Sequence, residues 1–143
     1  MICCDTSFLY SLYGGDAHTP RALAFLRRIN NSVSISELNR FELANALRLA
    51  SFRKLISMAQ RDLFLAQSER DILRGLLAVQ IINLADVLAE AGRISEAHTP
   101  AGGHRGFDIL HVAAAKKIGA TDFLTFDQNQ RKLARAVGLK VPL

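Results

Sequence analysis

Short apolar runs alternate with longer amphipathic segments along the chain. The first run, Met1–Cys4, predicts a buried strand that leads directly into an acid, Asp5. An acid at the mouth of a buried strand is costly unless a partner compensates its charge. Further apolar runs predict strands at Val33–Ile35, Ala78–Asn83, Phe123–Phe126 and Leu139–Val141.

The segments between these runs carry apolar residues at helical spacing, so each predicts at least one helix. The first helix contains Phe8, Leu9, Leu12 and Tyr13 and stops at Gly14 and Gly15. Further helices are expected at Thr19–Ile29, Ser36–Phe52, Leu84–Ala97, Phe107–Ile118 and Asn129–Val137, with two more between Ser57 and Leu77. The Pro- and Gly-containing stretch His98–Arg105 is expected to be a loop.

This alternation of strands and helices predicts an α/β fold, with a parallel sheet that has helices on both faces. The length of 143 residues suits one domain. In such sheets, ligands bind beyond the carboxyl ends of the strands. The position of each acid relative to its strand therefore indicates whether it lies near a ligand.

Two acids lie at the ligand end of predicted strands. Asp5 follows the first strand and Asp127 follows Phe123–Phe126, whereas Asp122 precedes that strand and lies at the opposite end. Helix capping is the alternative for Asp5 and Asp127, because each precedes a helical segment and Asp is a favoured N-cap residue.

A third acid, Asp108, lies in the first turn of a helix that is apolar on almost every side. Such a helix is expected to be buried. His111 follows one turn later on the same face. A cap or a partner for the helix dipole is the alternative for Asp108, but a buried acid beside a histidine needs a cation or a close hydrogen bond.

A fourth acid, Glu42, forms a polar stripe with Asn45 and Arg48 on the predicted helix Ser36–Phe52. A solvated helix face is the favoured interpretation of this stripe. A polar pocket lined by the stripe is the alternative, and the local sequence does not decide between the two.

The composition places the chain in a broad class. Eighteen Lys and Arg against 13 Asp and Glu leave a net charge of +5, which favours polyanions such as nucleic acid; a basic surface without such a partner is an equal alternative. Cys3 and Cys4 show no metal-binding spacing and are typical of a reducing compartment. No signal peptide or membrane-spanning run is visible, so a cytoplasmic protein is expected.

Acids gathered at one sheet edge repel one another and raise one another's pKa. Mg²⁺ or Mn²⁺ would relieve this repulsion, since both prefer oxygen ligands. Such a site suits phosphodiester hydrolysis, and a basic excess elsewhere would hold the nucleic acid.

Three stretches resemble the PIN-domain family, and VapC-type toxin ribonucleases in particular. The opening "CCDTSFL" resembles the family's first strand with its Asp-Thr/Ser, and "RFELANAL" resembles its acid-bearing helix. The most specific stretch is "FDILHVAAAKKIGATDFLTFDQNQRKLARAVGL". Together the three stretches place the family's four acids on Asp5, Glu42, Asp108 and Asp127.

The resemblance implies a single PIN-like domain over residues 1–143, a three-layer α/β/α sandwich with about five parallel strands. It also implies Mg²⁺- or Mn²⁺-dependent cleavage of RNA. Asp5 and Asp108 would be the central metal ligands, with Glu42 and Asp127 completing the pocket. Ser7 and Thr125 are expected to orient water or an acid, with capping or strand packing as the alternative. His111 and Arg105 are candidates for supporting the acids or contacting phosphate.

As a VapC-type toxin, the chain is expected to bind a small antitoxin protein that blocks the acidic pocket. A homodimer is also expected, with an apolar face around Phe8, Leu12 and Phe25. The alternative function is a non-catalytic module on the same fold that binds nucleic acid or protein. A receiver domain fits less well, because "SISELN" at the end of the second strand has no Asp and Asp5 stands alone after the first. A haloacid-dehalogenase phosphatase and a dinucleotide-binding protein fit less well, because "DTSFLYSLYGG" has neither D-x-D nor G-x-G-x-x-G.

Overall fold

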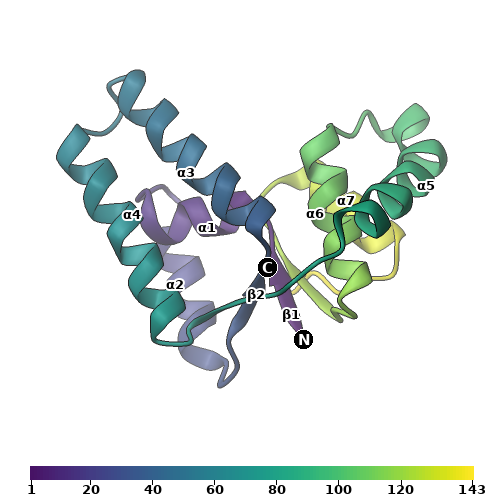
Figure 1. The fold of residues 1–143 in the computed structure, drawn as a ribbon, viewed down its shortest axis with the longest axis horizontal. Helices are drawn as coiled ribbons and strands as arrows, with labels where there is room; N and C mark the ends of the chain where they lie inside the picture. The colour runs from purple at the N-terminus through teal and green to yellow at the C-terminus, as the bar shows by residue number, and fades with distance from the viewer.

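The computed structural model describes residues 1–143, and its centre is a parallel sheet of four strands (Figure 1). In spatial order the strands are β3 (Leu77–Val79), β2 (Val33–Ile35), β1 (Ile2–Cys4) and β4 (Asp122–Leu124). Ile2 of β1 lies opposite Val33 on one side and Asp122 on the other. The predicted α/β class is confirmed.

Helices form a layer on each face of this sheet (Figure 1). One layer contains α1 (Thr6–Tyr13), α2 (Thr19–Arg28), α3 (Glu37–Phe52) and α4 (Met58–Leu73). The other contains α5 (Leu84–Gly102), α6 (Gly106–Lys117) and α7 (Gln128–Ala136). Each layer encloses its own core, and the adjacent residues Cys4 and Cys3 of β1 point into different ones. The three-layer sandwich is therefore as predicted.

The order of the strands creates a switch point between β1 and β4. From β1 the chain moves to β2 and β3 on one side of the sheet, and then returns to β4 on the other side. The connections after β1 and before β4 thus lie on opposite faces (Figure 1). A crevice forms where such connections diverge, at the carboxyl ends of the two strands.

Two of the predicted elements are wrong in the helical layers. A single helix, α4, replaces the two helices expected between Ser57 and Leu77. It starts at a capping box formed by Ser57 and Gln60, and its packing on the first core keeps it continuous. The expected loop His98–Arg105 is helical as far as Gly102. Pro100 lies in the last turn of α5, although it removes one backbone hydrogen bond there and its ring crowds the preceding turn. The helix then ends at Gly103, whose φ of 62° suits glycine.

The edges of the sheet also differ from the prediction. The third strand starts one residue earlier, at Leu77, and ends at Val79 rather than Asn83. The strand expected at Leu139–Val141 is reduced to a single bridge between Lys140 and Asp122.

Phe8 and Phe25 cannot form the apolar dimer face predicted for them. Phe8 is fully buried and Phe25 is 8% exposed, because both belong to the core between the sheet and its first helical layer. These rings stabilise the fold and are not available to a second subunit. None of the helices combines the length and the apolar character that crossing a membrane requires.

Candidate active site

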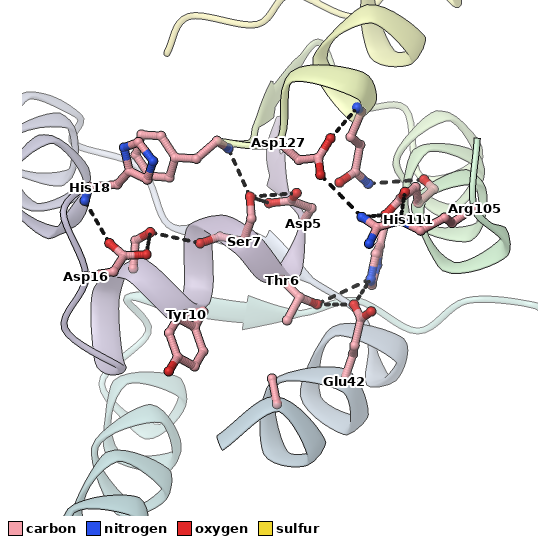
Figure 2. Close-up of a pocket in the computed structure, with 15 residues that line it drawn as sticks. Asp5, Thr6, Ser7, Tyr10, Asp16, His18, Glu42, Arg105, His111 and Asp127 are labelled. Atoms are coloured by element: carbon pink, nitrogen blue, oxygen red, sulfur yellow. Dashed lines mark hydrogen bonds and ion pairs between the residues drawn. The ribbon is translucent and has the colours of Figure 1, made fainter. Parts of the chain in front are cut away.

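A pocket of about 400 Å³ lies at the carboxyl ends of β1 and β4, between the two helical layers (Figure 2). All four acids singled out from the sequence line it: Asp5, Glu42, Asp108 and Asp127. They come from the end of β1, from α3, from α6 and from the start of α7. Asp122 lies at the other end of β4 and does not line the pocket, as predicted.

The carboxylate of Asp5 is almost fully buried and held by three protein donors. Its Oδ1 accepts the backbone N–H of Phe8 at 2.9 Å, which makes Asp5 the N-cap of α1. Its Oδ2 accepts the Thr125 hydroxyl at 2.6 Å, and the Ser7 hydroxyl lies 2.8 Å from both oxygens. Asp5 is therefore both a cap and a pocket residue, so neither interpretation excludes the other.

Burial raises the pKa of Asp5 to about 6, although the hydrogen bonds from Thr125, Phe8 and Ser7 and the charge of His111 oppose the rise. The protein donors thus compensate the carboxylate only in part. A cation in the pocket would favour its ionised form.

Ser7 and Thr125 connect the ends of β1 and β4. The Ser7 hydroxyl accepts the backbone N–H of Phe126 at 2.9 Å, and the Thr125 hydroxyl accepts that of Asp127 at 3.0 Å. Both hydroxyls also contact Asp5. In the structure, therefore, they position an acid, and Thr125 does so from a fully buried site.

Glu42 lies on the pocket side of α3 and contacts two partners through one oxygen. Its Oε2 accepts the Thr6 hydroxyl and lies 2.6 Å from Nε2 of the buried His111. Burial would raise the pKa of Glu42, but the hydrogen bonds from His111 and Thr6, with the charges of His111 and Arg105, outweigh it and lower the pKa. The pocket interpretation holds for Glu42, whereas Asn45 and Arg48 are exposed.

Arg105 pairs with the two remaining acids. Its Nε donates to Asp108 Oδ2 at 2.8 Å, and its Nη2 donates to Asp127 Oδ2 at 3.2 Å (Figure 2). The hydrogen bond to Asp108, together with the nearby carboxylates, raises the pKa of Arg105. Asp127 uses its other oxygen to cap α7, accepting the backbone N–H groups of Asn129 and Gln130. Arg105 is thus the cation that the buried acid on α6 needs.

The donor types of this pocket fit Mg²⁺ or Mn²⁺, because four carboxylates from four elements line one cavity. Asp5, Glu42, Asp108 and Asp127 would be the residues to hold the ion. No three acidic, histidine or cysteine side chains yet converge on one point. Convergence requires Arg105 to release Asp108 or Asp127, since its guanidinium lies between them.

Several pocket residues carry no signal that singled them out in the sequence. Thr6 directly follows Asp5, and its contact with Glu42 spans 36 positions. Gln130 is buried and donates to the backbone oxygen of Asp108 at 3.1 Å. Tyr10, Asp16 and His18 lie on the side of the pocket away from Arg105 (Figure 2). Ser11, Ala46 and Phe126 also line the pocket; Ser11 donates to Asp16, and Phe126 stacks on His18. Gln130 could have been identified only from its burial as a polar residue one helical turn after Asp127, and the sequence alone does not show burial.

The fold and the pocket define an α/β protein with an acidic ligand site at its topological switch point. The PIN-domain model matches residues 2–136, and the chain belongs to this family. No curated protein sequence matches the chain.

Solved structures with the same fold cover nearly the whole chain. VapC20 of Mycobacterium tuberculosis, described as a sarcin-ricin loop cleaving toxin, is 21% identical over 97% of this chain and 96% of its own, with a TM-score of 0.70. FitAcB of Neisseria gonorrhoeae is 20% identical over 99% and 96%, with a TM-score of 0.69. VapBC2 of Rickettsia felis, bound to promoter DNA, is 20% identical over 99% and 97%, with a TM-score of 0.64.

Replacing Asp5 with Asn should remove a pH dependence of folding. The folded pKa of about 6 lies above the ordinary value of 3.8 for this side chain, so Asp5 stabilises the fold below about pH 4, and this contribution is lost as the pH rises through 6. Relative to Asp5→Asn, wild type in chelator should therefore lose stability on the order of 2–3 kcal/mol over that range, because the other acids, such as Glu42, titrate in both proteins. Asn can still cap α1 and can donate to Thr125.

Urea unfolding from pH 4 to pH 7.5 in chelator measures this difference. Asp122→Asn is the matched control, because it removes an acid at the opposite end of β4 and should keep the wild-type slope. If Asp5→Asn is less stable than wild type at pH 7.5, the charge of Asp5 acts only to stabilise the N-terminus of α1.

Removing the charge of Arg105 should strengthen the response to metal. In Arg105→Gln, an added cation no longer competes with the guanidinium for Asp108 and Asp127. Without metal, the variant should lose about 1 kcal/mol of stability or more, because the buried carboxylate of Asp108 loses its cation. With Mn²⁺, the melting temperature should rise more for the variant than for wild type.

Thermal melts with chelator and with a series of Mn²⁺ concentrations test this competition. Arg93→Gln is the control, since Arg93 pairs with Glu90 outside the pocket. A smaller metal response in Arg105→Gln than in wild type would mean that Arg105 assists metal binding instead of opposing it.

Proposed function

We propose that this chain is a metal-dependent endoribonuclease whose pocket acids are Asp5, Glu42, Asp108 and Asp127. The observation that carries the proposal is that these four carboxylates, from distant parts of the sequence, line one pocket at the switch point of a PIN domain. The net charge of +5 supports a polyanionic substrate, because it offsets the repulsion between the acids and a phosphate backbone.

When bound, Mg²⁺ or Mn²⁺ supplies positive charge for the scissile phosphate and makes a water molecule more acidic. The residues of the chain hold and orient the groups around it. Ser7 and Thr125 fix the carboxylate of Asp5 at the centre of the pocket. His111 and Thr6 hold one oxygen of Glu42, which leaves the other for the pocket.

Arg105 has two roles in this scheme. Without substrate it neutralises Asp108 and Asp127. Once it is released, its planar guanidinium suits two oxygens of a phosphate group, as it suits carboxylates. Its side chain is 73% exposed, so it can make this exchange without rearrangement of the core.

The biological role that we propose is that of a toxin with a small antitoxin partner. The resemblance to VapC-type proteins suggests this role, and the pocket supports it. The position of Arg105 indicates that a guanidinium fits between Asp108 and Asp127. An Arg side chain from a partner protein would find the same two acceptors and would exclude a metal ion from them.

Purified protein should cleave RNA in the presence of Mg²⁺ or Mn²⁺ and should stop when a chelator is added. Asp108→Asn should lower the rate by about 100-fold or more, since even residues that only support metal ligands typically contribute 10–100-fold. Asp122→Asn is the control and should cleave as wild type does. Gel analysis of single-stranded and structured RNAs measures these rates.

Two results would contradict this proposal. Cleavage that continues in chelator would rule out the metal mechanism. RNA binding without cleavage, under every metal condition, would favour the non-catalytic binding module.

The toxin role predicts an effect in cells. Expression of the chain alone in a bacterial host should arrest growth, because no antitoxin is present to block its acidic pocket. Asp108→Asn, produced at the same level, should allow growth. Normal growth with a wild-type protein that cleaves RNA after purification would indicate a ribonuclease that is not a toxin.

A further inference from the structure

The side of the pocket opposite the paired acids has a different character. Figure 2 shows Tyr10, Asp16 and His18 on the side away from Arg105 and His111. These residues and Phe126 line the same cavity as the four acids. None of the interactions that hold the acids involves Tyr10, Asp16 or His18, so this side has no assigned role in the scheme above.

The rings of His18 and Phe126 are stacked. Their centroids lie 4.5 Å apart and their planes differ by only 6°. Phe126 is buried, and its ring also stacks against Phe8 at 6.0 Å. His18 is exposed, so one face of its ring rests on Phe126 and the other is open to a ligand.

The loop that carries His18 is held in place by its own hydrogen bonds. Asp16 accepts the backbone N–H of His18 at 2.8 Å and the Ser11 hydroxyl at 2.9 Å. The Thr19 hydroxyl donates to the backbone oxygen of Ser11 at 2.6 Å and accepts the N–H of Asp16. The ring of His18 is thus positioned before any ligand arrives, which lowers the entropy cost of binding.

The stacked pair is directly connected to the acids. Phe126 lies between Thr125 and Asp127, and its N–H donates to the Ser7 hydroxyl that contacts Asp5. A ligand group on His18 would therefore lie beside whatever the acids bind. If the acids bind a phosphate, the neighbouring group of an RNA strand is a nucleobase.

The lining favours a flat heteroaromatic ligand over an apolar peptide. Only three of the 15 residues around the pocket are hydrophobic, so most of the side chains around a ligand carry a polar group that can bond to its edge. A nucleobase has a π-face for the open ring and polar edges for Tyr10 and Asp16. Proteins that bind single-stranded RNA commonly stack bases on aromatic or histidine side chains.

We propose that His18, supported from below by Phe126, is a stacking site for a nucleobase next to the phosphate that is cleaved. This inference rests on the proposed ribonuclease function and adds a substrate contact to it. Stacking tolerates different bases, so the site would select unpaired nucleotides more than a particular sequence. RNA that presents an unstacked base beside the cut position would be the preferred substrate.

Cleavage kinetics and RNA affinity test the site together. In the active chain, His18→Ala should raise KM about tenfold with little change in kcat, as expected for the loss of one base stack. His18→Phe should restore KM because it restores a π-face, whereas His18→Leu should not, although it still covers Phe126. His98→Ala is the control, since His98 lies on α5 outside this pocket.

Affinity is measured in the Asp108→Asn background with short RNAs that carry one abasic nucleotide at successive positions. At one position, removing the base should weaken binding to the protein with His18 as much as His18→Ala weakens binding of the intact RNA. Combining that abasic RNA with His18→Ala should cause no further loss. Additive losses at every position would overturn the inference, as would equal KM values for wild type and His18→Ala.

These outcomes are distinguishable from failure of the proposed function. A wild-type chain that cleaves no RNA refutes the ribonuclease, while the abasic series still reports whether a base lies on His18. A chain that cleaves RNA with no dependence on His18 keeps the ribonuclease and removes the stacking site. Thermal melts of the three His18 variants verify that each is folded.

Discussion

The buried carboxylate of Asp5 is the constraint on which the edge of the sheet depends. An acid at this depth must be hydrogen-bonded, and its donors come from α1 and from the segment after β4. Ser7 and Thr125 therefore join the two strand ends that flank the switch point. The need to satisfy one charge aligns β1, α1, β4 and α7 around a single pocket.

The other acids are compensated in separate pairs instead of one cluster. His111 and Thr6 hold Glu42, and Arg105 holds Asp108 and Asp127. Each pair lowers the repulsion that four carboxylates in one cavity would otherwise cause. Asp5 remains the acid whose charge is only partly compensated, and a divalent cation would draw the acids together by replacing the charge of Arg105.

Local pattern was a good guide to the sheet and a weaker guide to the helical layers. Short apolar runs predicted β1 and β2, although β1 starts at Ile2 and not at Met1. The continuity of α4 and the passage of α5 through Pro100 depend on packing against the core, which outweighs local helix-breaking signals. Burial of Phe8 and Phe25 depends in the same way on which face each helix turns to the sheet.

By itself, the sequence determined which acids end strands, since the placement of Asp5 and Asp127 follows from the direction of parallel strands. It left open whether Glu42 faces solvent or the pocket, because a polar stripe looks the same in either case. Only the tertiary structure decided this, together with the pairing of Arg105 and the stacking of His18 on Phe126. These contacts join residues far apart in the chain, and their energy exists only after the layers have packed.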